Sequence, residues 1–355
     1  MPKMKYKWSS MTNKVAIFSD LHLGIKQDSV VWHNIALKWC DWFVSELKKR
    51  EISDIVFLGD FFHTRNTISA NTLHIASEVL NKMNDFNVHF ILGNHDLYYA
   101  NEPTVSPVNL FQGRNNIKVY AKPETVKFGN KSALMCGWGY NPEDYEADVL
   151  FTHAEINAFR FNTEVGPCEN GFKASGLLKN FNIVYSGHFH LRQKKKWGDK
   201  EIAYVGNTFP MDHSDNHLTK KGFDIFNFDT FESEFIENKL SPRFYKIRLS
   251  ELAEYEWPIE EMFTVIHQNN IKLIIDRNIT YQDSNILKSL IDNYEPLDFN
   301  IEWENGKNFS QEISEISFEA LNMKEAIKRY VECLDIPDKE SIKDYMVQLY
   351  EKTQV

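Results

Sequence analysis

The sequence predicts an α/β protein built around two facing β-sheets. Five short runs rich in Val, Ile and Phe, at residues 15–19, 55–59, 88–93, 149–152 and 183–187, have the length and composition of buried strands. Helical patterns separate the first three runs, and this alternation is typical of a parallel sheet. Shorter segments after residue 110, some of alternating polarity, predict a second, partly antiparallel sheet that faces the first.

The two helices between the first three strands are predicted from apolar residues at spacings of three and four. Trp32, Trp39 and Phe43 mark the first helix, and Leu73 and Leu80 mark the second. The segments assigned to the second sheet are residues 117–120, 124–128, 133–137, 203–206 and 223–228.

The pattern changes near residue 241. Strand patterns at 244–249, 271–275 and 297–303 alternate with helical patterns at 259–267 and 283–294, which predicts a separate α+β unit. Two short amphipathic helices are predicted after that unit, and the first follows a capping box at Asn322 and Glu325. They dock either on their own chain or in a groove of a partner protein. The resulting domains are 1–14 (an N-terminal extension), 15–240, 241–306 and 307–355, and either Met1 or Met11 fits as the start.

Composition narrows the class of protein. The net charge of −10 argues against a general nucleic-acid binder, so any phosphate contact must be local or rely on metal ions. The four cysteines show no CxxC spacing, which favours free thiols in a reducing compartment. The first 14 residues have no apolar core of a secretory signal, and no apolar run approaches the ~18 residues of a spanning helix. We therefore expect a cytoplasmic protein without a membrane partner.

Each of the five predicted strands ends in a polar side chain that can bind a metal ion. The stretches are DLHLG at 20–24, GDFFH at 59–63, GNHD at 93–96, TH at 152–153 and GHFH at 187–190. A lone histidine in an apolar run, such as His89, is usually a core residue. Five such strand ends indicate a shared partner, because buried carboxylates and imidazoles need one and strand ends of an α/β sheet gather at one edge.

The donor set indicates two metal ions. Seven candidate ligands are too many for one ion and suit two ions that share a carboxylate. Oxygen and imidazole donors without thiolate fit Mn²⁺, Fe²⁺ or Zn²⁺, with Mg²⁺ less well matched. His188 and His190 are expected to share one face of a strand end, because alternate residues of a strand point the same way. Two ions ~3.5–4 Å apart form the clamp used in phosphoryl chemistry. No GxSxG motif offers a side-chain nucleophile.

Taken in order, these motifs resemble the calcineurin-like metallophosphoesterase superfamily. More narrowly, the chain is similar to the SbcD family, the nuclease half of the SbcC–SbcD DNA double-strand-break repair complex, and to its phage-encoded recombination endonuclease subunits. The resemblance is strongest at DLHLG, GDFFH, GNHD, GHFH and the YVGNTFP stretch at 204–210. It implies a two-sheet metallophosphoesterase sandwich with α/β/β/α layers, a small α+β capping domain and a C-terminal helical pair.

The resemblance also implies roles for individual residues. One metal ion is held by Asp20, His22 and His190, the other by Asn94, His153 and His188, with Asp60 as the bridge. His95, hydrogen-bonded by Asp96, is the implied acid or transition-state donor, and His63 lies near the same phosphate. The expected ions are Mn²⁺ before Mg²⁺.

The implied activity is that of a two-metal DNA nuclease, a 3′–5′ exonuclease on duplex DNA and an endonuclease. It acts with an SbcC-type ABC ATPase in double-strand-break processing, recombination and repair, as a homodimer within a heterotetramer. The Trp32, Trp39 and Trp42 face either forms that dimer surface or packs on the sheet. The capping domain selects DNA, and the C-terminal helices bind the ATPase. The residues proposed to bind the ATPase are Ile327, Tyr330, Val331, Leu334, Tyr345, Met346 and Leu349.

A basic stretch beside the last motif offers phosphate contacts. The candidate DNA-binding residues are Arg65, Arg192, Lys194, Lys195 and Lys196. The alternative for the three lysines is a solvated hairpin tip.

Two rival functions stay open at this point. Another metallophosphoesterase, such as a phosphoprotein phosphatase or a cyclic-nucleotide or small-molecule phosphodiesterase, would use the same metal site. GDFFHTR and GNHD differ from the GDxVDRG and GNHE of phosphoprotein phosphatases and favour the nuclease branch. A non-catalytic scaffold of this fold would lack a ligand or His95, and neither is missing.

Overall fold

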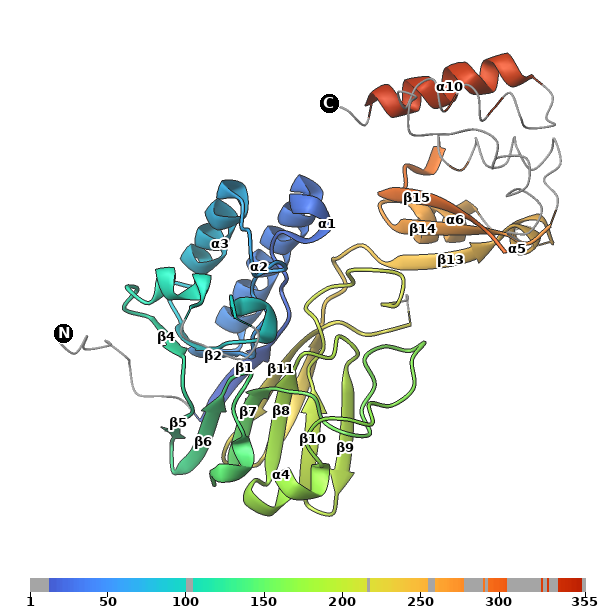
Figure 1. The fold of residues 1–355 in the computed structure, drawn as a ribbon. Coiled ribbons are helices and arrows are strands. Elements are labelled where there is room, and N and C mark those ends of the chain that lie inside the picture. Colours follow the sequence, from blue (N-terminus) through green and yellow to red (C-terminus); the bar gives the residue numbers. More distant parts are fainter. Residues whose placement is uncertain are drawn as a thin grey trace. The chain divides into compact units, whose positions relative to one another are not determined.

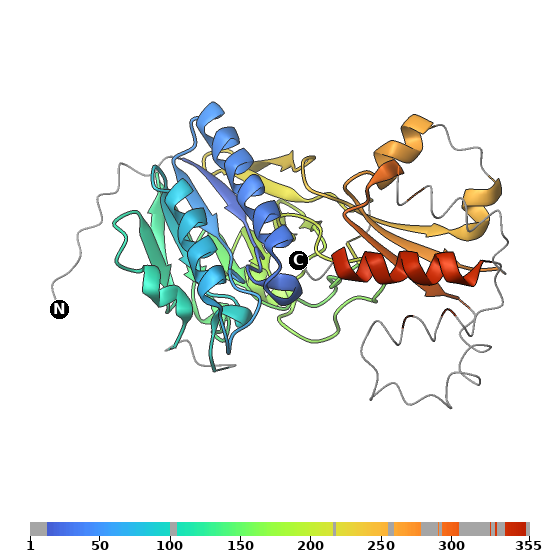
Figure 2. The ribbon, with the colours of Figure 1, turned by 90° about the horizontal axis from the view of Figure 1, so that it is seen from above.

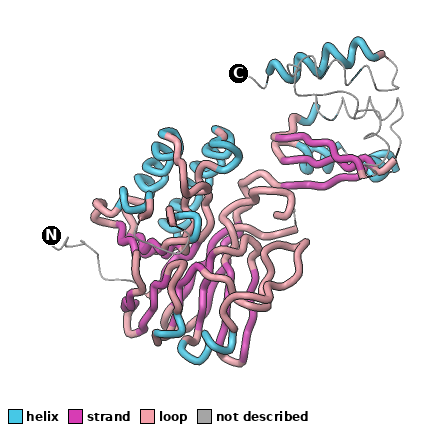
Figure 3. Tube along the Cα trace, in the orientation of Figure 1, coloured by secondary structure: helices cyan, strands magenta, loops and turns pink. Residues whose placement is uncertain are grey.

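The computed structural model describes residues 13–99, 105–215, 218–254, 259–277, 293–304 and 338–352, together with Leu290, Ile327 and Val331. The chain divides into two units, Met1–Arg243 and Phe244–Val355, each with its own sheet system (Figures 1 and 3).

The first sheet of the larger unit is mostly parallel, with strand order β12-β11-β1-β2-β3-β4. Its strands are β1 (Lys14–Phe18), β2 (Asp54–Phe57), β3 (Asn87–Ile91), β4 (Ile117–Tyr120), β11 (Gly222–Asn227) and β12 (Glu232–Glu237). The first four run parallel, while β11 and β12 are antiparallel additions at one edge. The crossover helices α2 (Val30–Lys49) and α3 (Ala70–Lys82) lie side by side (Figure 2).

The second sheet has strand order β5-β6-β7-β8-β10-β9. Its strands are β5 (Glu124–Phe128), β6 (Lys131–Cys136), β7 (Val149–His153), β8 (Ile183–Gly187), β9 (Gln193–Trp197) and β10 (Lys200–Tyr204). The four central strands are parallel, and both edge strands are antiparallel. The short helix α4 (Ala174–Asn180) packs on this sheet through Leu177 and Leu178. Short turns are α1 (Ile25–Asp28), η1 (Asn94–Asp96), η2 (Pro107–Phe111) and η3 (Pro142–Asp144).

A shared apolar core joins the two sheets. Val56 and Leu58 from the first sheet pack in one buried cluster with Phe151 and Tyr185 from the second. Each such side chain contributes about 1.5–3 kcal/mol when fully buried. The core fixes the two sheets face to face, with α2 and α3 on one side and α4 on the other. The predicted two-sheet α/β/β/α sandwich is therefore confirmed.

The assignment of strands to sheets was partly wrong. Residues 117–120 and 223–228 were assigned to the second sheet, but β4 and β11 belong to the first. β4 pairs in parallel with β3, the strand before it in the chain, whereas β11 pairs antiparallel with β1, which is distant in sequence. Local composition does not encode such pairing, and antiparallel edge strands on a parallel sheet are common.

The tryptophan face of α2 packs within its own chain. Trp39 is 1% exposed and stacks on Phe43 with 4.9 Å between ring centroids, and Phe18 lies 5.0 Å from it. Trp32 is also buried, and Trp42 meets Phe223 edge to face. Of the two alternatives for these rings, packing within their own chain is the one that the structure shows.

Replacing Trp39 by Ala is expected to lower the free energy of unfolding by about 3–5 kcal/mol, because the cavity forfeits the stacked contacts of a buried indole. Urea unfolding followed by circular dichroism measures this change. Trp197→Ala is the matched control. Its ring is 40% exposed on β9, and we expect a loss of about 1 kcal/mol or less. Equal losses for the two variants would contradict the core role of Trp39.

The smaller unit contains a three-stranded parallel sheet of β13 (Phe244–Arg248), β14 (Asn270–Ile275) and β15 (Asp298–Trp303). Helices α5 (Leu249–Glu254) and α6 (Ile259–Ile266) accompany it, and Leu273 and Ile266 lie in its core. These elements agree with the predicted α+β pattern, apart from the predicted helix at 283–294, most of which lies outside the described residues.

The second predicted C-terminal helix is α10 (Lys339–Lys352). On it Tyr345 is half-buried, while Met346 and Leu349 are exposed. Val331 is buried and Ile327 half-buried, whereas Tyr330 and Leu334 lie outside the described residues. Across the part of the chain that is described, no helix has both the length and the apolar character for a membrane crossing.

Candidate metal centre

The five polar strand ends meet although they come from two sheets. β1, β2 and β3 supply the first three from one sheet, and β7 and β8 supply the others from the second. Four of the seven predicted ligands have left-handed backbone: Asp20 (φ 55°), His22 (φ 48°), Asp60 (φ 59°) and His188 (φ 87°). Such conformations are uncommon for residues other than glycine and tend to occur at functional sites. Here they turn the chain sharply after β1, β2 and β8.

One donor cluster consists of Asp20, His22 and His190. The Nε2 atoms of His22 and His190 are 3.0 Å apart, and Asp20 Oδ1 is 3.8 Å from the former and 4.0 Å from the latter. Burial lowers the pKa of His22 well below its usual value, so its ring is neutral. A neutral imidazole offers the lone pair that a metal ion needs.

The second donor cluster consists of Asn94, His153 and His188, with Asp60 beside them. Asn94 Oδ1 lies 3.0 Å from His153 Nε2 and 3.0 Å from His188 Nδ1. His153 Nδ1 donates to the carbonyl of Leu58 at 2.7 Å, which leaves its Nε2 facing the cluster. Burial, together with His153, lowers the pKa of His188 to about 3.

Asp60 lies between the two clusters. Its Oδ2 is 3.3 Å from His153 Nε2 and 3.8 Å from His22 Nε2. Its Oδ1 accepts a hydrogen bond from the backbone N–H of His95 at 2.8 Å. Burial opposes ionisation, but the neighbouring histidines, His153 first, hold the pKa of Asp60 below its usual value. Asp20 also meets the second cluster, but only through the backbone N–H of His188, which donates to its carboxylate at 3.2–3.3 Å.

These residues fit divalent metal ions. When the His153 ring is neutral, its Nε2 lone pair faces Asn94 Oδ1 and the Asp60 carboxylate. All three groups are then hydrogen-bond acceptors. Facing acceptors are unfavourable in a buried site without a positive centre between them. The same demand for positive charge is visible in His153, because Asp60 outweighs the opposing effect of burial and raises the pKa of His153 to about 9. A divalent ion satisfies the same acceptors and also suits their mixed oxygen and imidazole chemistry.

The reason given for pairing His188 with His190 was wrong. β8 ends at Gly187, and His188 adopts positive φ, so the two residues do not share a face of an extended strand. The turn separates them instead, and His188 reaches Asn94 while His190 reaches His22. A regular strand would have aimed both rings in one direction.

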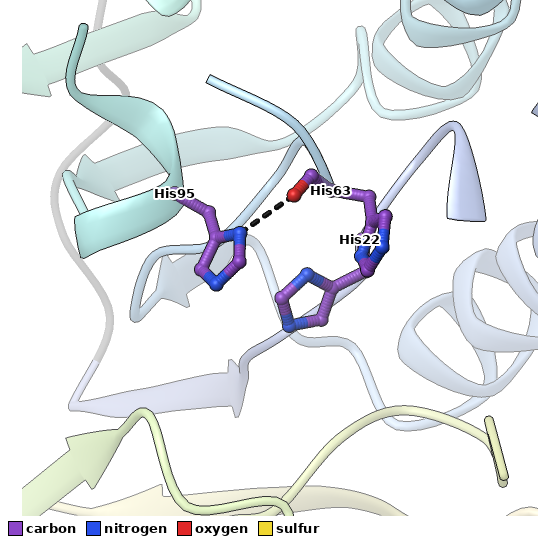
Figure 4. Close-up of side chains that lie close together, drawn as sticks. All are labelled: His22, His63 and His95. Atoms are coloured by element: carbon purple, nitrogen blue, oxygen red, sulfur yellow. Dashed lines mark hydrogen bonds between the residues drawn. The ribbon is translucent and has the colours of Figure 1, made fainter. Parts of the chain in front are cut away.

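A third set of side chains, His22, His63 and His95, borders the two donor clusters (Figure 4). His95 Nδ1–H donates to the backbone carbonyl of His63 at 2.6 Å, which leaves its Nε2 free for another partner. The His22 and His95 ring centroids are 5.0 Å apart. Among the described residues, neither His22 Nδ1 nor His63 Nδ1 has a hydrogen-bond partner, although both are buried.

Asp96 does not orient His95 through the predicted hydrogen bond. Its carboxylate accepts from the backbone N–H groups of Asp60, Phe61, Phe62 and Gly93 at 2.8–3.3 Å. Burial raises the pKa of Asp96 to about 7. Asp96 therefore fixes the backbone on either side of Asp60, while the carbonyl of His63 orients the His95 ring. Motif spacing alone did not distinguish a side-chain partner from backbone partners.

Two glycines let these strand ends approach closely. Gly59 has φ 99°, and a Cβ there would lie 2.5 Å from the backbone nitrogen of Gly93. A Cβ at Gly93 would overlap the Asp60 carboxylate. Glycine is required at both positions because the Asp60 and Asn94 turns touch through their backbones.

A buried ion pair supports the turn that carries His190. Lys221 is 2% exposed, and its Nζ donates to the carbonyl of His190 at 2.7 Å and to the Asp215 carboxylate. The other Asp215 oxygen accepts from Asn207 at 2.8 Å and from the Met211 backbone at 3.0 Å. The sequence reasoning missed this pair, although a lysine directly before an apolar strand was a usable signal.

Replacing Lys221 by Met is expected to lower the free energy of unfolding by about 3–5 kcal/mol, because it leaves the Asp215 carboxylate buried without its cation. Lys220→Met is the adjacent control. That side chain is 67% exposed and lies 3.7 Å from Glu237, a surface pair worth about 1 kcal/mol or less. Chemical denaturation of both variants tests the difference, and matching midpoints would refute the supporting role of Lys221.

Two further side chains beside the second cluster were also missed. Glu155 Oε1 lies 3.4 Å from His188 Nε2, on the opposite side of that ring from Asn94. A carboxylate there orients the ring and favours the tautomer with Nδ1 unprotonated. The Trp138 ring centroid is 4.9 Å from that of His188. Trp138 follows the end of β6, as the ligands follow their own strands. This position could have identified Trp138 from the sequence.

The candidate DNA-binding residues fall into two groups. Arg65 lines a hollow of about 350 Å³ together with His63 and His95, so the structure brings it to the site. Arg192 forms an ion pair with Asp224, and its Nη2 lies 2.7 Å from that carboxylate. Lys194, Lys195 and Lys196 lie on the edge strand β9, where Lys194 pairs with Glu201 at 2.8 Å.

Comparison with known families agrees with this geometry. Residues 13–226 match the family model described as calcineurin-like phosphoesterase. The chain belongs to the calcineurin-like phosphoesterase family. The predicted class of enzyme, a metal-dependent phosphodiesterase, is thereby confirmed, and the Asp and His clusters are the groups that can bind its divalent metal ions.

The individual proteins that resemble this calcineurin-like phosphoesterase share less than a third of its sequence. Exonuclease subunit 1 of Enterobacteria phage T4 is 28% identical over 361 residues, which covers 96% of this chain and all of that protein. An archaeal phosphodiesterase structure has 12% identity and a TM-score of 0.36, covering 63% of this chain and 99% of its own. A dimetal phosphatase from Danio rerio has 10% identity and a TM-score of 0.39, covering 61% and 92%.

Proposed function

We propose that this protein is a two-metal-dependent DNA nuclease, with 3′–5′ exonuclease activity on duplex DNA and endonuclease activity. The observation that carries the proposal is the pair of donor clusters joined at Asp60, with His95 held beside them. The similarity to Exonuclease subunit 1 of phage T4 along 96% of the chain supports exonuclease activity.

The assignment of ligands follows the two clusters. Asp20, His22 and His190 would hold one ion, and Asn94, His153 and His188 the other, with Asp60 shared. We propose Mn²⁺ as the ion. When bound, two divalent ions supply positive charge that polarises a phosphodiester and lowers the pKa of the attacking water.

The chain's own groups then position and protonate the substrate. Water attacks phosphorus and loses a proton to solvent, and the bond from phosphorus to the leaving oxygen breaks. His95 acts as an imidazolium, with Nδ1–H on the His63 carbonyl, and donates its Nε2 proton to the leaving oxygen. The carbonyl of His63 fixes the ring by accepting from Nδ1–H at 2.6 Å. Arg65, in the hollow beside His63 and His95, contacts a flanking phosphate. This contact needs no basic surface elsewhere on an acidic chain.

A partner is part of the proposal. The phage relative is named as a subunit, and α10 exposes Met346 and Leu349 in the segment proposed to bind an SbcC-type ABC ATPase. We propose that the complex is a heterotetramer with two copies of this chain, acting in double-strand-break processing, recombination and repair in the host cytoplasm. The unit from Phe244 is proposed to act as the DNA-selecting cap.

The test uses linear duplex DNA labelled at either its 3′ or its 5′ end, incubated with the purified protein and Mn²⁺ or Mg²⁺. We expect immediate release of label from the 3′ end and stepwise shortening of the 5′-labelled strand with Mn²⁺. Hydrolysis of a simple phosphodiester without DNA cleavage would leave two explanations, an obligatory partner or a phosphodiesterase of another substrate class. Addition of an SbcC-type ATPase separates them, because only the first predicts that cleavage then appears.

A further inference from the structure

An aromatic pocket of about 350 Å³ opens beside the second donor cluster. The rings of Trp138, Tyr140 and Phe172 line it, and His153 and Glu155 form its polar side. His153 is also a proposed metal ligand, so the pocket and the metal centre share a wall. Nothing in the proposed chemistry at the phosphate uses the three aromatic rings.

The aromatic walls are held in place by hydrogen bonds. Tyr140 donates its hydroxyl to the carbonyl of Ala121 at 3.1 Å, and the backbone N–H of Trp138 donates to the carbonyl of Leu92 at 2.9 Å. Phe172 donates its N–H to the carbonyl of Glu155 at 2.9 Å. Trp138, Tyr140 and Phe172 are each half-buried among the residues that line the pocket, and Tyr140 and Phe172 also pack against the core beneath. Aromatic residues fixed in this way are suited to stacking a flat ligand at low entropic cost.

We infer that this pocket binds the nucleobase of the nucleotide whose phosphate lies at the metal centre. The inference rests on the proposed function, since it takes a nucleic-acid strand as the substrate. The pocket adjoins the phosphate site, its walls suit a planar heterocycle, and base stacking on aromatic rings tolerates every sequence. The Glu155 carboxylate on its rim accepts a hydrogen bond from an exocyclic amino group or ring N–H of the base.

The pocket restricts the form of the substrate. A base within a duplex is stacked and paired, so it reaches an aromatic pocket only after leaving the helix. The protein is therefore expected to act on a nucleotide that has frayed from a DNA end or lies in a single strand. A mismatch at the 3′ end lowers the cost of unpairing, so it should increase the cleavage rate.

The first test is a binding measurement that does not depend on cleavage. Titration calorimetry with Mn²⁺ compares deoxyadenosine 5′-monophosphate with deoxyribose 5-phosphate, which lacks only the base. We expect the nucleotide to bind at least about tenfold more tightly to the wild-type protein. Trp138→Ala should remove this difference, Trp138→Phe should keep most of it, and Trp197→Ala, an exposed tryptophan on β9, should leave it intact.

Equal affinity for the two ligands in the wild-type protein, or no binding of the nucleotide, would overturn the inference whatever the variants do. A base-dependent difference that survives Trp138→Ala in a folded protein would overturn it as well, because the base would then bind elsewhere. Thermal unfolding of each variant establishes that it is folded.

A cleavage experiment separates this inference from the proposed function. The substrate is duplex DNA whose 3′-terminal nucleotide carries either a mismatched normal base or a tetrahydrofuran abasic analogue, so that neither end is paired. The wild-type protein should cleave the abasic end about tenfold more slowly, and Trp138→Ala should cleave both ends at one rate. A wild-type protein that binds the nucleotide through Trp138 but cleaves no DNA even with an SbcC-type ATPase present would contradict the proposed nuclease and support the pocket.

Discussion

Replacing Asp60 by Asn is expected to abolish DNA cleavage, with a loss of at least about a hundredfold. Replacing a residue that only supports a metal ligand already lowers metal affinity or activity by about 10–100-fold. Asp60 is itself the side chain that approaches both clusters. Asparagine keeps the size of the side chain but removes the charge that two neighbouring cations need. The measurement is the initial rate of label release from 3′-labelled duplex DNA in Mn²⁺.

The matched control for this variant is Asp85→Asn. That carboxylate is 71% exposed and pairs with Lys48 at 2.9 Å in an ordinary surface ion pair. We expect its cleavage rate to equal that of the wild-type protein. Wild-type activity in Asp60→Asn would contradict the role of Asp60 as a ligand shared by two metal ions.

His95→Ala is expected to lower kcat by about 10²–10⁴-fold while leaving metal binding unchanged. This is the range for loss of a positioned proton donor. His95 Nδ1 is bound to the carbonyl of His63, so only Nε2 is available to the substrate. Cleavage rates at saturating DNA give kcat, and calorimetric titration with Mn²⁺ gives the number of bound ions and their affinity.

The control for His95 is His74→Ala, an exposed histidine on α3. It should change neither kcat nor metal affinity. Loss of both metal ions in His95→Ala would show that His95 is a ligand rather than a proton donor, and an unchanged kcat would exclude any catalytic role.

The sequence predicted the strands and the site better than it predicted the pairing of strands. All five apolar runs with polar ends are strands, because buried parallel strands have a strong local signature in Val, Ile and Phe. The sheet that β4 and β11 join depended on their pairing with β3 and β1, which no local pattern records. The three tryptophans of α2 were ambiguous for a similar reason, since an apolar helix face looks the same whether it packs on a sheet or on another subunit.

At the site, the motifs predicted which side chains gather but not how the backbone delivers them. The left-handed turn at His188 replaced the expected strand face, and Asp96 bonds to backbone amides rather than to the His95 ring. Both details depend on dihedral angles that residue identity only weakly specifies. Trp138 and Lys221 had only a weak signal in their positions beside strands, and Glu155 had none, so the folded arrangement was needed to assign their contacts.

The claim that two adjacent donor clusters hold two ions is tested most directly by crystals grown with Mn²⁺ and measured at the manganese absorption edge. The account predicts two anomalous peaks, one bounded by Asp20, His22 and His190 and the other by Asn94, His153 and His188, with Asp60 beside both. A single peak at saturating Mn²⁺, or peaks away from Asp60, would contradict it.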